Sequence, residues 1–348
     1  MFDILLEKLG IHFHREKMEG FDPNYQNKIG VLLTNLGTPD NPTKKSLRKY
    51  LKEFLSDERV VDYNRVLWFL ILYGIILNVR PKRSAKLYKK IWTEKGSPLM
   101  VYMNEIVEKL KIVMDQKNLM VELGMRYGNP SIESALEKFK KNNIMKVLII
   151  PLYPQAGSPT SSSTLDKINI VLNKWPWVPN IRFVNGYHDR EDYIKALQKS
   201  ISAFIPDMQE IEMLVFSFHG MPFRYLKEGD PYYCFCHKTA RLVAEELKIE
   251  KEKYRLAFQS RFGREEWLKP YVDEEIIKFA KSGVKKLHII SPGFSVDCLE
   301  TLEEIQIQYK ELFIENGGED LVYIPCLNSN DDQINMLHSI VKENILGW

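Results

Sequence analysis

The sequence predicts an α/β protein made of two similar open-sheet domains with a cleft between them. Short apolar runs rich in β-branched residues alternate with amphipathic segments along the 348 residues, which is typical of parallel sheets covered by helices on both faces. The runs are continuously apolar, as expected for strands that are buried on both sides. Motifs of the first half also recur in the same order in the second half, which indicates an internal duplication.

The alternation predicts eight strands with helices between them. Amphipathic segments such as 131–141 and 271–281 have the spacing of helices that bury one face. In open parallel sheets, ligands bind beyond the carboxyl ends of the strands, so site residues are expected at those ends. The expected strands are 29–35, 120–125, 145–150, 181–184, 213–218, 255–259, 285–290 and 321–324.

Three pairs of motifs indicate the duplication. Each pair falls at the carboxyl end of an expected strand, so the cleft between the halves is the expected site. We expect an N-terminal amphipathic arm at 1–28, a first domain at 29–165 and a second domain at 166–348, with the C-terminal segment packing back on the first domain as an option. The pairs are "LLTNLGTP" (32–39) with "VFSFHGMP" (215–222), "GMRYG" (124–128) with "QSRFG" (259–263), and "KVLIIPLYP" (146–154) with "KLHIISPGF" (286–294).

Composition and charge exclude several classes of protein. The chain is 45% hydrophobic and 27% charged, as in ordinary globular proteins. A net charge of +3 and the lack of basic blocks interleaved with aromatics argue against a nucleic-acid partner. Four cysteines form no disulfide framework, so a reducing compartment, the cytoplasm, is expected. The closest pair, in "CFCH" (234–237), lacks the spacing and the distant partner pair of a zinc site.

His219 is the first candidate for chemistry, because it ends the apolar strand expected at 213–218. A lone histidine at a strand end is more often structural than functional. However, Gly220 and Pro222 predict a turn with close backbone approach, and a cluster of carboxylates follows another expected strand. An imidazole facing carboxylates suits two tasks, namely weak binding of a divalent metal such as Fe(II) and proton transfer.

The carboxylate cluster follows the strand expected at 285–290, and a helix is expected to begin near Asp297. Glu300, Glu304 and Gln308 are spaced four residues apart, so they are expected to share one helical face. One interpretation is a capping box, because acids are favoured at a helix start. The other is a ladder of carboxylates that leads into the cleft. The histidine at the matching end of another strand favours the ladder.

The apolar run 66–79 has 14 residues and is too short to cross a bilayer, because a spanning helix needs about 20. Large apolar side chains cover every helical face, so part of the run is expected to be exposed unless it is fully buried. A lip that touches a membrane surface or a flat apolar ligand fits this pattern. Arg80 and Arg83 follow directly and could meet ligand carboxylates.

Several stretches resemble those of the ferrochelatase family, whose members insert ferrous iron into a porphyrin in the last step of heme synthesis. The most specific is "VFSFHGMPFRYLKEGDPYY" around His219, and the resemblance covers nearly all residues from 29 to 330. It implies a chelatase fold of two Rossmann-like halves, which agrees with the duplication. The other stretches are "LLTNLGTPDNPTKKSLRKYLKEFLSDERVV" (32–61), "KGSPL" (95–99), "MRYGNPSI" (125–132), "PLYPQ" (151–155), "FQSRFGREEWLKPYVDE" (258–274) and "VDCLETLEEI" (296–305).

The resemblance also implies roles for individual residues. His219 and Glu300 are expected to be the catalytic pair on opposite sides of the porphyrin, with ferrous iron as a substrate and no cofactor. Together with Asp297 and Glu304, they are the expected metal-binding residues. The residues expected to contact protoporphyrin IX are Leu36, Arg80, Arg83, Arg126, Tyr127, Ser260 and Trp267.

Some positions depart from the family pattern. Ala156 stands where an aromatic residue is usual, and Gln308 stands where some members carry another acid. Leu36 replaces the tyrosine of the coproporphyrin-using branch, which favours protoporphyrin IX as the substrate. The cysteine-rich C-terminal extension of members with an iron–sulfur cluster is missing, so no cluster is expected.

Three alternatives stay open. The chain could be a coproporphyrin ferrochelatase, a chelatase for another tetrapyrrole such as a cobalt chelatase, or a non-catalytic carrier of heme or another tetrapyrrole. We expect a cytoplasmic protein, with peripheral contact to the inner face of the membrane as an option.

Overall fold

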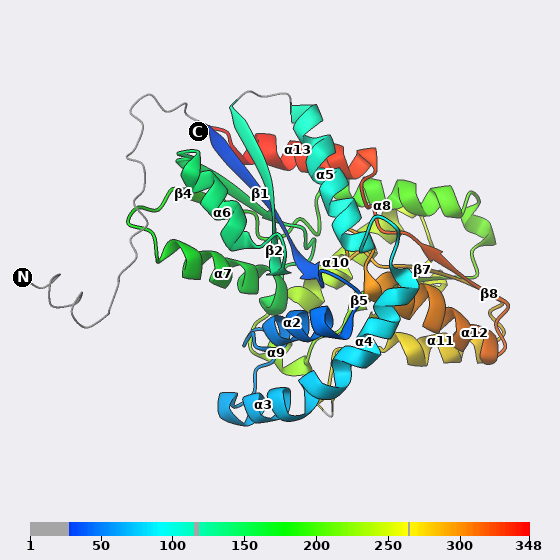
Figure 1. Cartoon of the computed structure of the whole chain (residues 1–348). Helices are drawn as coiled ribbons and strands as arrows, with labels where there is room; N and C mark the ends of the chain where they lie inside the picture. Colours follow the sequence, from blue (N-terminus) through cyan, green and yellow to red (C-terminus); the bar gives the residue numbers. More distant parts are fainter. Residues whose placement is uncertain (1–27, 115–117, 264) are drawn as a thin grey trace, which may run out of the picture.

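The computed structural model describes residues 28–114, 118–263 and 265–348. These residues form two halves, each built on a four-stranded sheet with helices packed around it (Figure 1). The first sheet has the strand order β2-β1-β3-β4 and the second has the order β6-β5-β7-β8. The arrangement therefore repeats, with β5 in the place of β1 and β7 in the place of β3. The predicted α/β fold class and the predicted duplication are confirmed.

The strands form at the expected apolar runs, and every paired neighbour is parallel. The central strands β1, β3, β5 and β7 are buried over nearly all of their length, which explains why their sequences are continuously apolar. The strands are β1 (Ile29–Thr38), β2 (Leu119–Gly128), β3 (Lys146–Pro151), β4 (Asn180–Phe183), β5 (Met213–His219), β6 (Tyr254–Gln259), β7 (Lys286–Ile290) and β8 (Asp320–Ile324).

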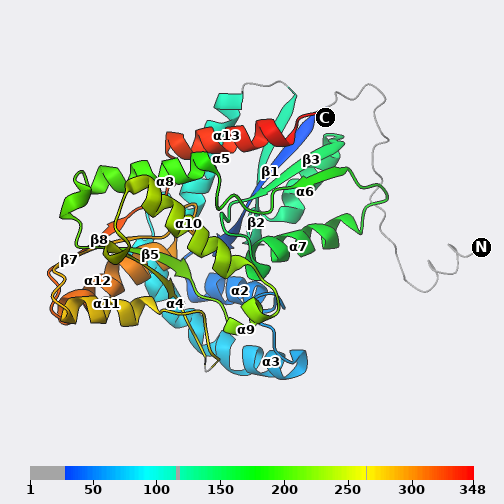
Figure 2. The same cartoon turned by 180° about the vertical axis from the view of Figure 1, so that it is seen from behind.

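Helices and helical turns fill the connections between the strands. Figures 1 and 2 show α6 and α7 on one face of the first sheet and α5 and α13 on the other. In the first half they are α2 (Lys44–Leu55), α3 (Arg65–Ile71), η1 (Leu72–Ile76), α4 (Leu77–Ile91), α5 (Pro98–Met114), α6 (Ile132–Lys141), η2 (Ser158–Ser162) and α7 (Ser163–Leu172). After β4 they are α8 (Glu191–Phe204), η3 (Met208–Glu210), α9 (Phe223–Lys227), α10 (Tyr232–Leu247), η4 (Lys251–Lys253), α11 (Val272–Lys281), η5 (Glu300–Tyr309), α12 (Lys310–Glu315) and α13 (Asp331–Asn344).

The first sheet extends past the domain boundary predicted at residue 165. Strand β4 pairs with β3, so residues 180–183 belong to the first sheet although the predicted boundary assigned them to the second domain. The last helix, α13, packs on α5 as well as on α8, which is the return to the first half that the sequence left as an option. The predicted N-terminal arm at 1–28 falls almost entirely outside the described residues.

One apolar cluster joins the two halves. Leu33 and Leu148 of the first sheet belong to the same buried cluster as Phe216 and Phe258 of the second. Burial of each such side chain stabilises the fold by about 1.5–3 kcal/mol. Because the halves share this core, the carboxyl ends of β1 and β5 are held in a fixed relation to each other.

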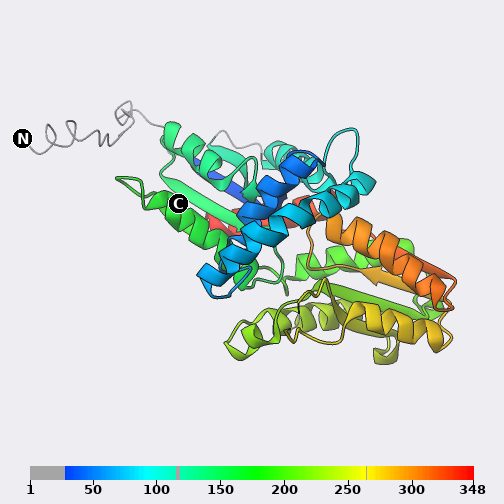
Figure 3. The same cartoon turned by 60° about the horizontal axis from the view of Figure 1, so that its bottom comes forward.

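The apolar lip, residues 66–79, comprises most of α3, all of η1 and the start of α4. Val66, Leu70 and Val79 are 73%, 68% and 68% exposed, whereas Trp68 and Leu72 are buried. Figure 3 shows α2, α3 and α4 lying across the junction between the two halves. The predicted exposure of the run is confirmed. Among the described residues, no helix combines the length and the apolarity that crossing a membrane requires.

Candidate functional site

His219 is the last residue of β5, and the turn that follows it fixes its ring. The Nδ1 atom lies 2.7 Å from the Gly220 carbonyl oxygen. A carbonyl only accepts, so Nδ1 carries the proton and the Nε2 lone pair of the neutral ring is left for a ligand. Gly220 packs so closely that a Cβ there would lie 2.8 Å from the Gln259 carbonyl oxygen and 3.0 Å from the Trp267 ring. The histidine side chain is half-buried, and the backbone that follows it is closely packed against Gln259 and Trp267.

Gln259 links this turn to the predicted carboxylates. Its carbonyl oxygen accepts a hydrogen bond of 2.8 Å from the Gly220 amide, and its Oε1 accepts one of 2.6 Å from Ser217 Oγ on the His219 strand. Its Nε2 donates to the Glu300 carbonyl oxygen at 2.9 Å and to Glu304 Oε2 at 3.2 Å. One buried amide thus fixes the strand of the histidine relative to the helix of the carboxylates.

The half-buried Glu300 side chain lies within electrostatic range of the first half. Burial, followed by the neighbouring Glu300 charge, raises the pKa of Tyr88 on α4 well above its usual value. Burial, the charge of Tyr88 and then the charge of Glu300 do the same to the pKa of Tyr50 on α2. Within the described residues, the Glu300 carboxylate accepts no hydrogen bond from an N–H or O–H group. It is thus a half-buried carboxylate without a strong hydrogen-bond donor among the described residues.

Arg80 lies opposite Glu300. Desolvation lowers the pKa of Arg80, the Glu300 charge opposes that shift, and the neighbouring Arg83 adds to it. Both arginines are nevertheless exposed. Arg80 therefore lies within electrostatic range of both Arg83 and Glu300.

Glu304 is held behind Glu300 at the end of β6. Its carboxylate accepts hydrogen bonds from the Ser260 amide at 2.9 Å, from Ser260 Oγ at 2.5 Å and from the Tyr309 hydroxyl at 2.8 Å. Burial and then the Glu304 charge raise the pKa of Tyr309. Ser260 adopts a left-handed backbone with φ of +64°, which turns its amide and hydroxyl to the same carboxylate. The predicted Ser260 and Glu304 thus contact each other.

Asp297 is buried away from the cleft and its carboxylate is fully occupied. It accepts hydrogen bonds from Thr301 Oγ1 at 3.0 Å, from Asn328 Nδ2 at 2.6 Å and from the Tyr323 hydroxyl. Its own amide donates to Asn328 Oδ1 at 2.8 Å. These contacts fix the loop before η5 to the segment after β8, so they provide a structural reason for an acid at this position.

The helix that carries Glu300 differs from the one that the sequence predicts. Residues Glu300–Tyr309 are π-helical, with hydrogen bonds between residues five apart instead of four. A four-residue spacing still keeps side chains near one face of such a helix, but Glu304 of the predicted ladder is already bonded to Ser260 and Tyr309. Gln308 donates to Glu303, and Glu303 is also paired with Lys90 of α4 at 2.8 Å.

Leu36 and Trp267 lie on the two sides of the junction. Leu36 is half-buried and packs on the cluster that includes Tyr50, Leu77 and Tyr127. Trp267 is 6% exposed and covers Gly220, and its indole N–H has no hydrogen-bond acceptor among the described residues. Both predicted contact residues therefore lie next to the strand ends.

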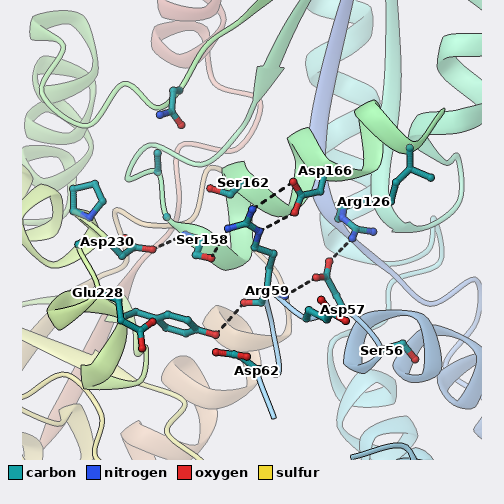
Figure 4. A pocket seen from close by; sticks show the side chains of 18 residues that line it. Ser56, Asp57, Arg59, Asp62, Arg126, Ser158, Ser162, Asp166, Glu228 and Asp230 are labelled. Carbon is teal, nitrogen blue, oxygen red and sulfur yellow. Dashed lines mark hydrogen bonds and ion pairs between the residues drawn. The ribbon is translucent and has the colours of Figure 1, made fainter. Parts of the chain in front are cut away.

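Arg126 and Tyr127 lie instead in a polar cluster beside the site. Arg126 is paired with Asp57 and donates to Ser163 Oγ at 2.7 Å, and the Tyr127 hydroxyl donates to Asp57 at 2.8 Å. Figure 4 shows Arg126 pointing to Asp57 in a pocket that Arg59 and residues before α7 and after α9 also line. Arg126 and Tyr127 are predicted to contact the porphyrin, and in the structure their polar groups are bonded to Asp57 and Ser163.

The described residues contain no group of three or more His, Cys, Asp and Glu side chains arranged to hold a metal. The predicted metal-binding residues His219, Glu300, Asp297 and Glu304 therefore form no such group, and their role in binding iron stays a prediction. The four cysteines are free, with Cys234 exposed and the other three buried.

Comparison with known proteins decides the family. The ferrochelatase family model matches residues 28–345. The chain belongs to the ferrochelatase family. Ferrochelatase from Marinobacter nauticus is 46% identical over 334 residues, which cover 95% of this chain and 90% of that protein. Ferrochelatase 2 from Shewanella oneidensis is 50% identical over 319 residues, covering 91% of this chain and 98% of that protein. The predicted resemblance is confirmed, and with it the class of enzyme, a lyase that acts as a metal chelatase.

Solved structures agree on the fold. SirB from Bacillus subtilis with Fe3+ superposes with a TM-score of 0.57 at 13% identity, covering 92% of this ferrochelatase-family chain and 96% of SirB. The sirohydrochlorin chelatase SirB from Bacillus subtilis subspecies spizizenii, in complex with cobalt, gives 0.55 at 12% identity, covering 91% and 94%. At this identity the match supports the two-domain chelatase fold alone.

Sequence reasoning missed three residues of this family member's site. Gln259 lies inside the quoted "FQSRFG" stretch, and Asp57 lies inside "FLSDERVV", so the resemblance contained both. Tyr88 lies on the basic helix after the apolar run and had no local signal. Each of them acts through partners distant in sequence, which a reading of local pattern does not reach.

Proposed function

We propose that this protein inserts ferrous iron into protoporphyrin IX and releases protoheme, the last step of heme biosynthesis. The observation that carries the proposal is the pairing of two free groups on one frame. His219 offers Nε2, and Glu300 offers a carboxylate that accepts no hydrogen bond from an N–H or O–H group of the described residues, while Gln259 is bonded to the backbone beside both of them. Membership in the ferrochelatase family supports the same chemistry.

The reaction requires bases. Iron enters as Fe2+, and two pyrrole protons leave, so charge and atoms balance without any redox step. His219 accepts a pyrrole proton at Nε2 while its Nδ1–H remains bonded to the Gly220 carbonyl, and this bond also stabilises the imidazolium that forms. Glu300 acts on the opposite side of the ring, where a carboxylate can bind Fe2+ or accept a proton. The two groups share proton acceptance and iron presentation, and Glu304 lies behind Glu300 as a second carboxylate.

The remaining predicted contacts position the porphyrin. Arg80 and Arg83 would bind its propionates, because guanidinium groups bind carboxylates strongly and directionally. Leu36, Trp267 and the apolar lip offer apolar surface to the ring. Contacts remote from the metal can supply the energy that bends a flat ring and exposes its nitrogens. Leu36 presents no hydroxyl, which supports protoporphyrin IX over coproporphyrin.

The test is an iron-insertion assay with protoporphyrin and coproporphyrin side by side. We expect His219→Ala to lower the insertion rate at least about 100-fold, the usual contribution of a proton-transfer group, with porphyrin binding and melting temperature retained. His338→Ala, on α13, is the matched control and should insert iron normally. Near-normal turnover by His219→Ala would sink the assignment. A preference for cobalt and sirohydrochlorin would favour the other chelatase, and binding without insertion by the wild type would favour a carrier.

We also propose a cytoplasmic location with peripheral contact to the membrane. The exposed apolar lip continues into a basic surface, since α2 carries five Lys or Arg and one Glu, and α4 carries six and no acid. Apolar side chains beside lysines favour an anionic bilayer surface. The protein should sediment with phosphatidylglycerol vesicles and not with phosphatidylcholine vesicles. Leu70→Ser should weaken this binding and Ile112→Ser, which is equally exposed on α5, should not; equal behaviour of the two variants would contradict the proposal.

A further inference from the structure

Arg224 lies five residues after His219, on the short helix α9, and its position relative to that histidine is fixed. The intervening turn is hydrogen-bonded to the segment 266–268. The Leu268 amide donates to the Met221 carbonyl oxygen at 2.9 Å, and the Phe223 amide donates to the Glu266 carbonyl oxygen at 2.9 Å. Any group that Arg224 binds is therefore held at a set position from the histidine.

Arg224 binds the first half of the molecule. Its guanidinium donates to the carboxylate of Asp62 and, at 3.2 Å, to the Asp62 carbonyl oxygen. Its Nε donates to Glu265 at 2.7 Å. The next residue, Tyr225, adds a hydrogen bond of 3.4 Å to the Arg59 carbonyl oxygen. The helical turn 224–225 of the second half is thus hydrogen-bonded to both ends of the segment 59–62.

Asp62 stands at the base of the apolar lip. It lies between α2 and α3, and the base of α3 is bound to the end of α2. Trp68 Nε1 donates to the Leu55 carbonyl oxygen at 2.6 Å, and Arg65 pairs with Glu58 at 3.2 Å. Movement of Asp62 would therefore move the lip. The helix α4, which continues the lip, is held near its C-terminal end by Lys90, which pairs with Glu303.

We propose that Arg224 is a positioning residue that sets the distance between the apolar lip and His219, and so fits the cleft to a porphyrin. This inference rests on the proposed function, in which a flat tetrapyrrole binds between the lip and the histidine. The Arg224 and Asp62 side chains are 29% and 56% exposed. Pairs this exposed contribute little to the free energy of folding, so their role lies in geometry.

The energetic consequence is a change in porphyrin affinity. Without the Arg224 contacts, the lip samples positions that do not close on the ligand, and the apparent affinity falls with the competent fraction. We expect Arg224→Ala to raise the KM and the Kd for protoporphyrin about twofold, which corresponds to a competent fraction of about one half. Once the ring is bound, the closed geometry is restored, so kcat should stay within about twofold, and the KM for Fe2+ should not change.

The experiment compares Arg224→Ala, Asp62→Ala, the double variant and the control Arg241→Ala, an exposed arginine that pairs with Glu245 on the same helix, α10. Porphyrin Kd comes from fluorescence titration without iron, and lip mobility comes from hydrogen exchange of residues 63–79. We expect faster lip exchange in Arg224→Ala but not in Arg241→Ala. The double variant should be no worse than Arg224→Ala, and Arg224→Lys should recover part of the affinity.

Three results would overturn the proposal: a Kd and lip exchange for Arg224→Ala equal to those of Arg241→Ala, effects of Arg224→Ala and Asp62→Ala that add, or a loss confined to kcat. These results are distinct from failure of the proposed function. A wild-type protein that inserts iron while Arg224→Ala binds porphyrin normally refutes the positioning role alone. A wild-type protein that binds no porphyrin refutes the function, and the exchange measurement still decides whether Arg224 holds the lip.

Discussion

The central strands of the two halves carry different side chains before a glycine, and their backbones differ there, since Gly37 has φ of +108° within β1 whereas Gly220 follows the end of β5. Strand β1 presents Leu36 before a glycine, and β5 presents His219 before a glycine. In the first half, the nearby polar groups bind one another, because Asp57 accepts hydrogen bonds from Arg126, Tyr127 and Ser163. The first half thus offers an apolar wall and a closed polar cluster.

In the second half, some polar groups are left open. His219 keeps Nε2 free, and Glu300 receives no N–H or O–H donor within the residues that the structure describes. Other carboxylates nearby are occupied, as Asp297 and Glu304 show. Both halves therefore place side chains at similar strand ends. The candidate reactive groups are those whose titratable atoms have no strong hydrogen-bond partner among the described residues.

The largest effect should come from the open carboxylate. Glu300→Gln should lower the rate of iron insertion at least about 100-fold, because the amide neither accepts a proton nor binds Fe2+ well. Its melting temperature should stay near the wild-type value, since no N–H or O–H group of the described residues loses its acceptor and the thiol of Cys298 is a weak donor. Glu315→Gln, at an exposed position of α12, is the matched control. Retention of most of the activity by Glu300→Gln would remove the contrast between the halves.

An occupied carboxylate should show the opposite pattern. Asp297→Asn leaves Tyr323, Thr301 and Asn328 with a poorer acceptor, and breaking a buried charged network costs roughly 2–4 kcal/mol. We therefore expect a lower free energy of unfolding in urea, with near-normal iron insertion per folded molecule. A stable variant that fails to insert iron would return Asp297 to the metal path predicted from the sequence.

Much of this architecture could be predicted from the sequence, because buried parallel strands carry a local signal. The apolar runs predicted all strands, and the strand-end rule drew attention to His219 and Glu300. The boundary at residue 165 came too early, since nothing local shows that β4 pairs with β3. The sequence also predicts an α-helix where η5 is π-helical, since hydrogen bonding between residues five apart has no signature in the local apolar pattern.

The occupancy of each acid could not be predicted in the same way. Asp297, Glu304 and Arg126 have partners 31, 44 and 69 residues away in the chain. A motif identifies the residue type at a position, whereas its hydrogen-bond partners follow from how the sheets and loops fold together. The structure was therefore needed to separate the carboxylate that faces the cleft from those that hold the loops.

The smallest effect concerns Leu36, the apolar residue that precedes the glycine in the first half. Leu36→Tyr introduces a hydroxyl into the wall beside Tyr50 and Tyr127, and coproporphyrin carries more carboxylates than protoporphyrin. A new hydrogen bond worth about 0.5–1.5 kcal/mol should shift the ratio of kcat/KM values towards coproporphyrin about twofold to tenfold. Leu36→Phe adds the ring without the hydroxyl and should leave the ratio unchanged. Equal shifts in both variants would mean that the size of the side chain at position 36, and not its polarity, sets the preference between the two porphyrins.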